Sequence, residues 1–534
     1  LRTVPTDSRG VAHILEHTAL CGSEKYPVRD PFFMMLRRSL NTFMNAFTSS
    51  DWTAYPFASQ NKKDFSNLLD VYLDAVFFSR LDPLDFAQEG HRVEFAEPEN
   101  SDSELVYKGV VYNEMKGAMS STVSTLWQTM TKYLYPETTY HFNSGGEPDD
   151  IPELSYDQLL DFYRTHYHPS NAVFMTFGDM PADELQQRFH DQALQRFERL
   201  DVTIEVPDEK RYHAPVAVQE YYAAESDDED KVHHVLAWLL GESTDLHAQL
   251  EAHLLSNVLL GDSSSPLRLA LETTDLGSSP SPLCGLEDSN REMCFMCGLE
   301  GSTVADAEAF QALVLATLQQ VADEGVERER VEAVLHQLEL SQREVSGDGM
   351  PYGLGLILSG LSAAIHRGDA IATLNLDPVL EQLRESIQDP DYIKGLAQKL
   401  ILDNRHRVRL SLLPDAELDQ RKTAAEAQRL ANKKAALNEQ EKQQIIDLTK
   451  ALADRQEQID DVEILPKVGI EDVPLEMVIA SGETLESAVM PCSYFVQGTN
   501  GLAYQQVVIE LPELEPELLD VLPYYTTCLT ELGI

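Results

Sequence analysis

The sequence predicts an α+β protein made of two tandem units, a charged helical hairpin and the start of a third unit. Residues 172–179 and 407–415 are apolar, each follows a long helical pattern, and each closes a unit of about two hundred residues. Residues 415–461 are rich in Ala, Glu, Gln, Lys and Arg and contain neither Pro nor Gly, which is helix composition. A chain of 534 residues is long enough for several domains.

These observations divide the chain into four segments. We expect a first α+β domain at 1–207, a second at 208–414, a helical hairpin linker at 415–470 and a truncated third domain at 471–534. Asn438 is the expected break between two antiparallel arms of the hairpin.

Apolar spacing predicts the elements of the first unit. The expected helices are 11–21, 32–40, 65–78, 86–91, 106–119 and 156–167. The expected strands are 92–95 and 172–178, with a hairpin in which 45–48 and 52–58 flank the turn at 49–51.

The same patterns predict the rest of the chain. The expected strands are 232–240, 407–413 and strand pairs within 284–299, and the expected helices are 247–260, 267–273, 307–322, 331–345 and 354–365. The third unit should hold a hairpin over 494–511 and a helix over 517–532. Cys294 and Cys297 form a lone C-x-x-C in an apolar run, which favours a buried strand over a zinc ribbon.

Composition excludes some classes of partner. The net charge of −48 argues against nucleic acid, because phosphate binding needs a basic surface. No apolar run is long enough to span a membrane, and six scattered cysteines fit a reducing compartment. We expect a soluble, cytoplasmic protein, with an organellar or periplasmic location left open. The chain begins without Met and ends directly after an apolar segment, so we expect a fragment.

The motif with the clearest chemistry is His13-Ile14-Leu15-Glu16-His17, an H-x-x-E-H sequence. On a helix, His13 and His17 point the same way one turn apart, and Glu16 lies beside them. Two neutral imidazoles are good zinc ligands, and Glu16 is placed to take a proton from a water molecule that the metal activates.

Zinc needs a third protein ligand, and spacing alone leaves two candidates. Glu114 lies in a helical pattern with apolar neighbours, and Glu94 lies in the preceding predicted strand. The second unit contains no H-x-x-E-H. Its His233 and His234 lie on a predicted strand and therefore point to opposite faces, so they cannot chelate one metal together.

Several motifs together resemble the pitrilysin/insulinase-type zinc metalloproteases, in particular their presequence-protease branch. The matching segments are GVAHILEH (10–17), LCGSEKYP (20–27), RDPFF (29–33), NAFT (45–48), NEMKG (113–117), SGGEP (144–148) and HYHPSNA (166–172). This family implies pitrilysin-like α/β sandwich domains in two halves, which close around a peptide chamber. The chain resembles the first half, the hinge and the opening of the third domain, so its C-terminal half is expected to be missing.

The resemblance also assigns roles to residues. It implies one Zn²⁺ bound by His13, His17 and Glu114, with Glu16 as the general base. It implies a substrate-binding edge strand at Asn45, Ala46, Phe47 and Thr48, in which Ala46 contacts the peptide backbone and Phe47 belongs to the core.

The expected function is therefore zinc-dependent endopeptidase activity on unfolded peptides. An Arg-Tyr pair that the family supplies from its last domain is absent from the 534 residues, so weak turnover is expected. The alternatives are a non-catalytic, peptide-holding subunit of the same family and a scaffold that the metal merely stabilises.

Overall fold

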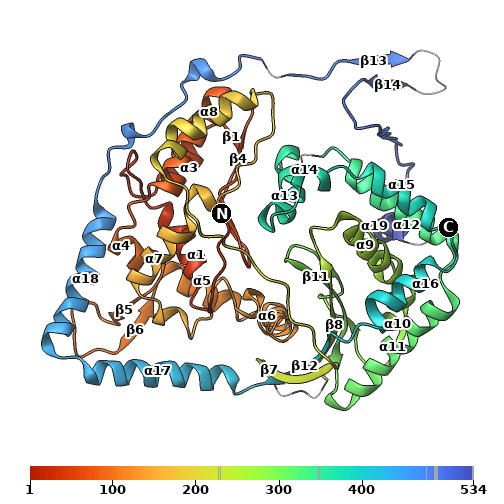
Figure 1. Ribbon diagram of the computed structural model, residues 1–534, viewed down its shortest axis with the longest axis horizontal. Coiled ribbons are helices and arrows are strands. Elements are labelled where there is room, and N and C mark those ends of the chain that lie inside the picture. The colour runs from red at the N-terminus through yellow and green to blue at the C-terminus, as the bar shows by residue number, and fades with distance from the viewer. Residues whose placement is uncertain (227, 229, 347–348, 477, 486–490, 532–534) are drawn as a thin grey trace. The chain divides into compact units, whose positions relative to one another are not determined.

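The computed structural model describes residues 1–226, 228, 230–346, 349–476, 478–485 and 491–531 (Figure 1). The chain divides into two compact units. The larger consists of residues 1–339 and 346–478, and the smaller of residues 340–345 and 479–534. Helices and strands mix along the chain, as the predicted α+β class requires. The boundaries near 207, 414 and 470 stay predictions.

Residues 1–207 form helices and short strands that pair two by two. The helices are α1 (Val11–Ala19), α2 (Pro31–Arg38), α3 (Lys62–Phe77), α4 (Pro83–Glu89), α5 (Val110–Ala118), α6 (Thr122–Leu134), α7 (Tyr156–His166) and α8 (Ala182–Gln192). The antiparallel pairs are β1 (Asn41–Met44) with β4 (Phe57–Ser59), β2 (Phe47–Thr48) with β3 (Thr53–Ala54), and β5 (Arg92–Phe95) with β6 (Leu105–Lys108).

Two predictions for this part are corrected. The predicted helix 106–119 begins as strand β6, and Gly109, at φ 159°, separates it from α5. The predicted strand 172–178 is not a strand. The ring of Phe174 packs against the rings of Phe77 and Phe189. These side-chain contacts hold the segment in place, and it pairs with no neighbouring strand among the described residues.

Residues 208–414 contain a sheet in which strand order is β10-β11-β8-β12-β7, with β9 beside β11. The strands are β7 (Val216–Ala223), β8 (Val232–Glu242), β9 (Ser279–Pro280), β10 (Gly285–Glu287), β11 (Glu292–Ser302) and β12 (Arg407–Asp415). All pairings are antiparallel except that of β12 with β7. The helices are α9 (Leu246–Leu260), α10 (Pro266–Thr273), α11 (Ala307–Glu324), α12 (Arg328–Arg343), α13 (Tyr352–Ile365), α14 (Ala370–Thr373), α15 (Asp377–Ser386) and α16 (Tyr392–Leu396).

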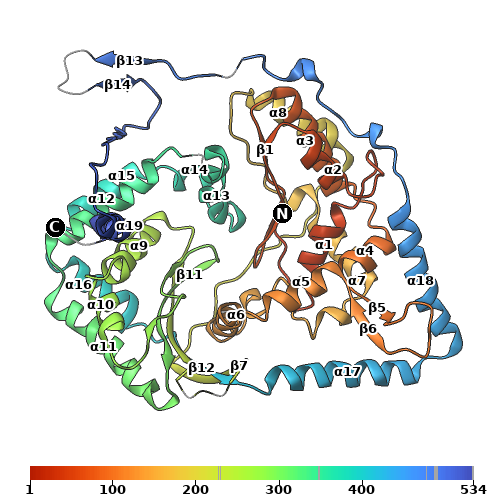
Figure 2. The same ribbon diagram turned by 180° about the vertical axis from the view of Figure 1, so that it is seen from behind.

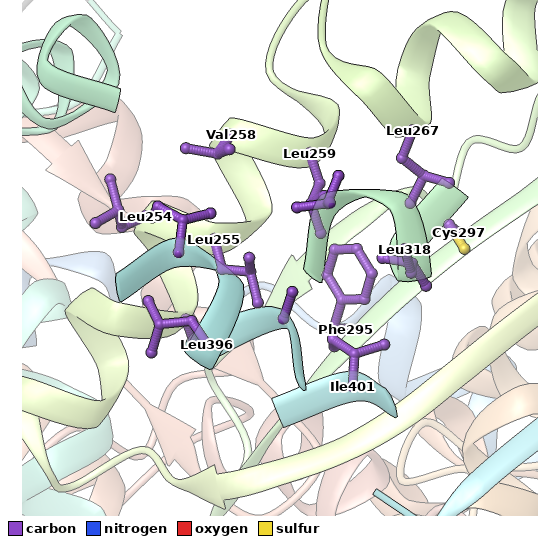
Figure 3. Packing of buried hydrophobic residues seen from close by; sticks show 14 of the residues in the cluster. Leu254, Leu255, Val258, Leu259, Leu267, Phe295, Cys297, Leu318, Leu396 and Ile401 are labelled. Carbon is purple, nitrogen blue, oxygen red and sulfur yellow. The ribbon is translucent and has the colours of Figure 1, made fainter. Parts of the chain in front are cut away.

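Both faces of this sheet are covered, which explains why its central strands are almost continuously apolar. On one face, Phe295 and Cys297 of β11 meet leucines from α9, α10, α11 and α16 (Figure 3). On the other face, β8 and β12 pack against α6, which comes from the first 207 residues. The residues in this contact are Leu126, Met130, Leu134, Val235, Ala237, Leu239, Val408, Leu410 and Leu412.

Cys294, Cys297 and His234 lie buried inside this sheet. Cys294 and Cys297 are both fully buried in β11, so the prediction of a buried strand is confirmed. His234 is buried as well, with Nδ1 2.9 Å from the hydroxyl of Ser411 and Nε2 2.8 Å from the carbonyl oxygen of Thr303. Both ring nitrogens of His234 are therefore already engaged within the sheet.

The linker forms two helices, α17 (Leu418–Ala436) and α18 (Glu439–Glu457). Asn438 caps α18 through a capping box with Glu441, which confirms the predicted break. The arms are not antiparallel, however. They diverge from the break, and each packs against the first domain, so their partner is that domain and not one another (Figures 1 and 2).

The smaller unit has β13 (Gly482–Leu485) paired with β14 (Cys492–Phe495), and helix α19 (Pro516–Glu531). The prediction of a hairpin over 494–511 is wrong, because β14 pairs with the earlier strand β13. Val508, in the second half of the predicted hairpin, is 84% exposed, so the apolar residues there do not form a buried strand. Residue 532, the predicted helix end, lies outside the described residues. Of the described helices, none is long and apolar enough to cross a membrane.

Arg2 links the first domain to α13. It is buried, and its guanidinium donates to the carbonyl oxygens of Ile365 at 2.6 Å and Ala364 at 2.8 Å, at the end of the helix. The amide of Asn171 in turn donates to the carbonyl oxygen of Arg2 at 2.7 Å. The positive charge of Arg2 thus interacts with the negative end of the α13 dipole and ties together two segments that are distant in sequence.

We predict that Arg2→Met lowers the free energy of unfolding by about 1.5–3 kcal/mol, because it leaves buried carbonyl oxygens without their charged donor. Denaturant unfolding of the chain measures this change. The control is Arg164→Met, which breaks the exposed pair with Asp161 and should change stability by less than about 0.5 kcal/mol. Equal effects of the two variants would contradict the prediction.

Candidate metal centre

Helix α1 presents its two histidines on one face. Its other face is buried in the core through Ile14 and Leu15, which fixes the rotation of the helix about its axis. The rings of His13 and His17 lie edge to face with their centroids 5.1 Å apart. The i, i+4 spacing therefore places both imidazoles as the sequence predicted.

Glu114 of α5 meets these histidines. Its Oε2 lies 3.8 Å from Nε2 of His13 and 3.7 Å from Nε2 of His17. The three donor atoms lie within 4.8 Å of one another. Tetrahedral bonds of about 2.0–2.1 Å place donor atoms about 3.3 Å apart, so a small inward movement of the half-exposed Glu114 would bring its carboxylate to that distance from both histidines.

The competing carboxylate, Glu94, is already paired. It is buried and contacts Arg92 at 3.0 Å and Lys108 at 2.5 Å. The structure thus separates two candidates that spacing left equal, and only Glu114 lies at the histidines.

Groups behind the histidines orient them for metal binding. Nδ1 of His13 lies 3.1 Å from the carbonyl oxygen of Gly145, and Nδ1 of His17 lies 3.2 Å from Oε2 of Glu89. When each Nδ1–H donates to its oxygen, each Nε2 keeps a free lone pair directed at Glu114. Sequence reasoning gave neither Glu89 nor Gly145 a role: Glu89 lies in no motif, and the SGGEP segment that contains Gly145 does not reveal its contact with His13.

The charges around His17 favour a cation. Burial lowers the pKa of His17, but the hydrogen bond to Glu89 and the charges of Glu16, Glu89 and Glu114 outweigh burial and raise the pKa above its ordinary value. Carboxylates that favour a proton on the imidazole also favour a divalent cation beside it. Metal and proton therefore compete for this nitrogen.

Two glycines allow the segments around the metal centre to lie in close contact. A Cβ on Gly109 would lie 2.0 Å from the carbonyl oxygen of Gly90, at the junction where α4 ends and α5 begins. A Cβ on Gly10, at φ 70°, would lie 2.8 Å from the carbonyl oxygen of Gly145, the acceptor for His13. Larger residues at these positions would push apart the elements that carry the donor atoms.

The general-base candidate, Glu16, has its own partner. It is 9% exposed, and the hydroxyl of Thr48 donates to its Oε2 at 2.5 Å. Thr48 also contacts the hydroxyl of Thr53 on the paired strand, at 3.4 Å. The β2–β3 hairpin thus fixes the direction of the Glu16 carboxylate.

The four residues predicted to bind substrate, at 45–48, differ in their exposure and in their contacts. Thr48 faces Glu16. Asn45 is exposed, and its carbonyl oxygen accepts from the hydroxyl of Tyr72 at 2.8 Å. Ala46 is partly exposed, and Phe47 is half-buried against Phe43, outside the main core. Their contact with a peptide stays a prediction.

Comparison with known proteins decides the family. Family models match consecutive parts of the chain: "Insulinase (Peptidase family M16)" at 2–122, "Peptidase M16 inactive domain" at 153–338 and, at 412–534, a region associated with a subgroup of the same peptidases. The chain is 40% identical over 539 residues to "Presequence protease, mitochondrial" of Xenopus tropicalis, a match that covers 100% of this chain and 52% of that protein. The chain belongs to the insulinase family of peptidases, M16. The resemblance expected from the motifs is thereby confirmed.

The M16 match extends to plants. The chain is 37% identical over 546 residues to "Presequence protease 1, chloroplastic/mitochondrial" of Arabidopsis thaliana, covering 100% of this chain and 50% of that protein. It thus spans about half the length of these relatives. Their names place those proteins in mitochondria or chloroplasts, and a cytoplasmic location for this chain is not confirmed.

Solved structures with a similar fold confirm the predicted fold class. A protease from Helicobacter pylori matches 77% of this chain and 93% of its own, with a TM-score of 0.59 at 17% identity. The first half of the periplasmic protease PqqL from Escherichia coli matches 82% of this chain and 90% of its own, with a TM-score of 0.52 at 14% identity. At these identities the likeness concerns the fold alone.

We predict that Glu89→Ala weakens zinc binding about tenfold to a hundredfold, because His17 loses the acceptor that orients its ring. Zinc affinity, measured by competition with a chelator, tests this. Glu99→Ala, in the exposed loop that joins β5 to β6, is the matched control and should leave the affinity unchanged. Equal affinities of Glu89→Ala and the unmodified chain would contradict the proposed role of Glu89.

Proposed function

We propose that this chain carries the catalytic centre of a zinc-dependent endopeptidase that hydrolyses unfolded peptides. The observation that supports this most is the convergence of His13, His17 and Glu114, with the carboxylate of Glu16 beside them on α1. Membership of a peptidase family and the names of the presequence proteases support the peptide class of substrate.

The residues divide the chemistry between them. When bound, zinc would lower the pKa of a water molecule to near 7 and polarise the scissile carbonyl. Glu16 would take the proton of that water and later deliver it to the leaving amine. Thr48 would hold the carboxylate of Glu16 in one direction during both transfers.

Asn45, Ala46 and Phe47 would present the substrate to this centre. They lead into the short strand β2, and we propose that a peptide adds along this edge through main-chain hydrogen bonds, which select weakly for sequence. The strongly acidic chain would attract basic peptides, and cleaved presequences are one such class. A closed chamber around the peptide would need the remaining length that the relatives have.

The proposal assigns a different role to residues 208–414. This segment lacks the zinc motif, and a family model described as an inactive domain matches most of it. We propose 1–207 as the catalytic domain and 208–414 as its non-catalytic partner, followed by the linker at 415–470.

We predict that Glu16→Gln keeps about one zinc per chain but lowers the cleavage rate about 10²–10⁴-fold, since an amide cannot act as a base. Metal analysis and a single-turnover assay with a fluorogenic peptide measure the two properties.

The control is Glu24→Gln, an exposed residue that should retain both properties. If Glu16→Gln cleaves at the full rate, the catalytic assignment is wrong. If the unmodified chain holds zinc and binds peptides without cleaving them, the non-catalytic, peptide-holding alternative is supported.

We predict that Thr48→Val slows cleavage about tenfold and leaves zinc affinity and KM unchanged. Valine keeps the branched shape but cannot donate to Glu16, and a hydrogen bond to a charged group contributes about 1.5 kcal/mol. Thr42→Val on the exposed side of β1 is the control. Loss of zinc together with activity would show that Thr48 acts only on the fold.

A further inference from the structure

The linker helices do not lie free in solvent. Leu430 of α17 is buried with Phe95 and Leu105 of the β5–β6 hairpin, and Ile445 and Ile446 of α18 pack against the same cluster. The two helices are thus docked on the catalytic domain by an apolar contact, with charged side chains on either side of it. Two of these charged contacts lead to the elements that hold the metal centre.

The first contact is made behind α5. The carboxylate of Glu426 on α17 lies 2.8 Å from the ammonium of Lys116 and accepts from the hydroxyl of Tyr112 at 3.0 Å. Tyr112 and Lys116 are one turn apart and share a face of α5. Glu114 lies midway between them in sequence and so points from the opposite face, toward His13. Glu426 therefore holds α5 from behind while Glu114 faces the metal.

The second contact is made at α4. Arg455 lies near the end of α18, and two of its guanidinium nitrogens donate to the buried carboxylate of Asp85 at 2.6 and 2.9 Å. A third nitrogen lies 3.5 Å from the carboxylate of Asp82 at the start of α4. Burial raises the pKa of Asp85 to about 6, and the guanidinium of Arg455 opposes this shift. The neighbouring Gln456 adds a hydrogen bond to Gln88 at 3.3 Å.

This contact continues to the histidines. Asp85 and Glu89 are four residues apart and share a face of α4. The amide of Gln88 donates to Glu89 at 2.8 Å, and Glu89 is the acceptor for His17. Fixing α4 at Asp85 therefore fixes the carboxylate that orients His17.

We infer that Glu426 and Arg455 are positioning residues of the metal centre: the linker braces Glu114 through α5 and Glu89 through α4. This inference rests on the proposed function, because it takes His13, His17 and Glu114 as the zinc ligands. It assigns to the linker a task beyond connecting domains. Undocking of the linker would relax two of the supports on which zinc affinity depends.

Another anchor of the linker supplies a matched control. The ammonium of Lys434 on α17 donates to the carbonyl oxygens of Asp102 and Ser103, in the loop between β5 and β6. This contact fastens the same helix to the same domain without touching α4 or α5. It separates loss of the brace from general loosening of the linker.

The experiment compares zinc affinity, by chelator competition, in the 534-residue chain and in the variants Glu426→Gln, Arg455→Met and Lys434→Met. We expect the first two to weaken zinc binding about threefold to tenfold, which is less than the roughly 10–100-fold of a group that contacts a ligand directly, and Lys434→Met to stay within about twofold. Thermal unfolding of the metal-free variants is recorded in parallel. If Arg455→Met does not fold, the conservative Glu426→Gln decides alone.

The outcomes separate the two proposals. A chain that binds zinc, and whose Glu426→Gln variant binds it as tightly, overturns the brace and leaves the proposed function intact. Equal weakening by Lys434→Met also overturns the brace, because the effect would then follow from docking in general. A chain that binds no zinc overturns both proposals.

Discussion

The geometry of the candidate centre depends on bringing Glu114 to two histidines on another helix. His13 and His17 share one face of α1 and position each other, but the carboxylate of Glu114 is half-exposed and has no buried packing of its own. The position of the Glu114 carboxylate is therefore determined by the position of helix α5. Everything that fixes α5 relative to α1 is part of the centre, from the glycine contact at Gly109 to the ion pair of Lys116 with Glu426.

The second domain contributes to this constraint through packing. Helix α6 follows α5 after a short turn and covers one face of the sheet formed by β8 and β12, so the chain that carries Glu114 continues directly into the core around this sheet. Arg2 adds a polar link to the end of α13. The helices that carry the candidate ligands are thus fixed between the sheet on one side and the linker on the other, and residues 208–414 support the centre without supplying a ligand.

The sequence was informative where the structure is local. The H-x-x-E-H spacing defines a face of one helix, and Asn438 caps the next helix through residues that follow it directly, so both could be predicted from short-range geometry. Glu114 was distinguishable from Glu94 only by resemblance to a family, because the distinction depends on how β6 and α5 divide at Gly109. Glu89 and Glu426 carry no motif, since their roles arise only from contacts between distant segments.

The wrong predictions have a related physical cause. Residues 172–178 have the apolar content of a buried strand, but a strand also needs a neighbouring ladder, and apolar content does not specify one. The composition of the linker predicts two antiparallel arms. In the structure, the apolar residues of the linker pack against the cluster around Phe95. Composition alone does not identify this contact.

The position of the linker in the chain has a consequence for the order of synthesis. Helix α1 and Glu114 are synthesised before the linker, and Arg455 follows Glu114 by about 340 residues. At roughly 5–20 residues per second, this interval lasts about 20–70 s. During that time the nascent chain would hold the three candidate ligands without the brace. If the linker braces the centre, zinc affinity would reach its full value only after Arg455 has been made and the linker has docked.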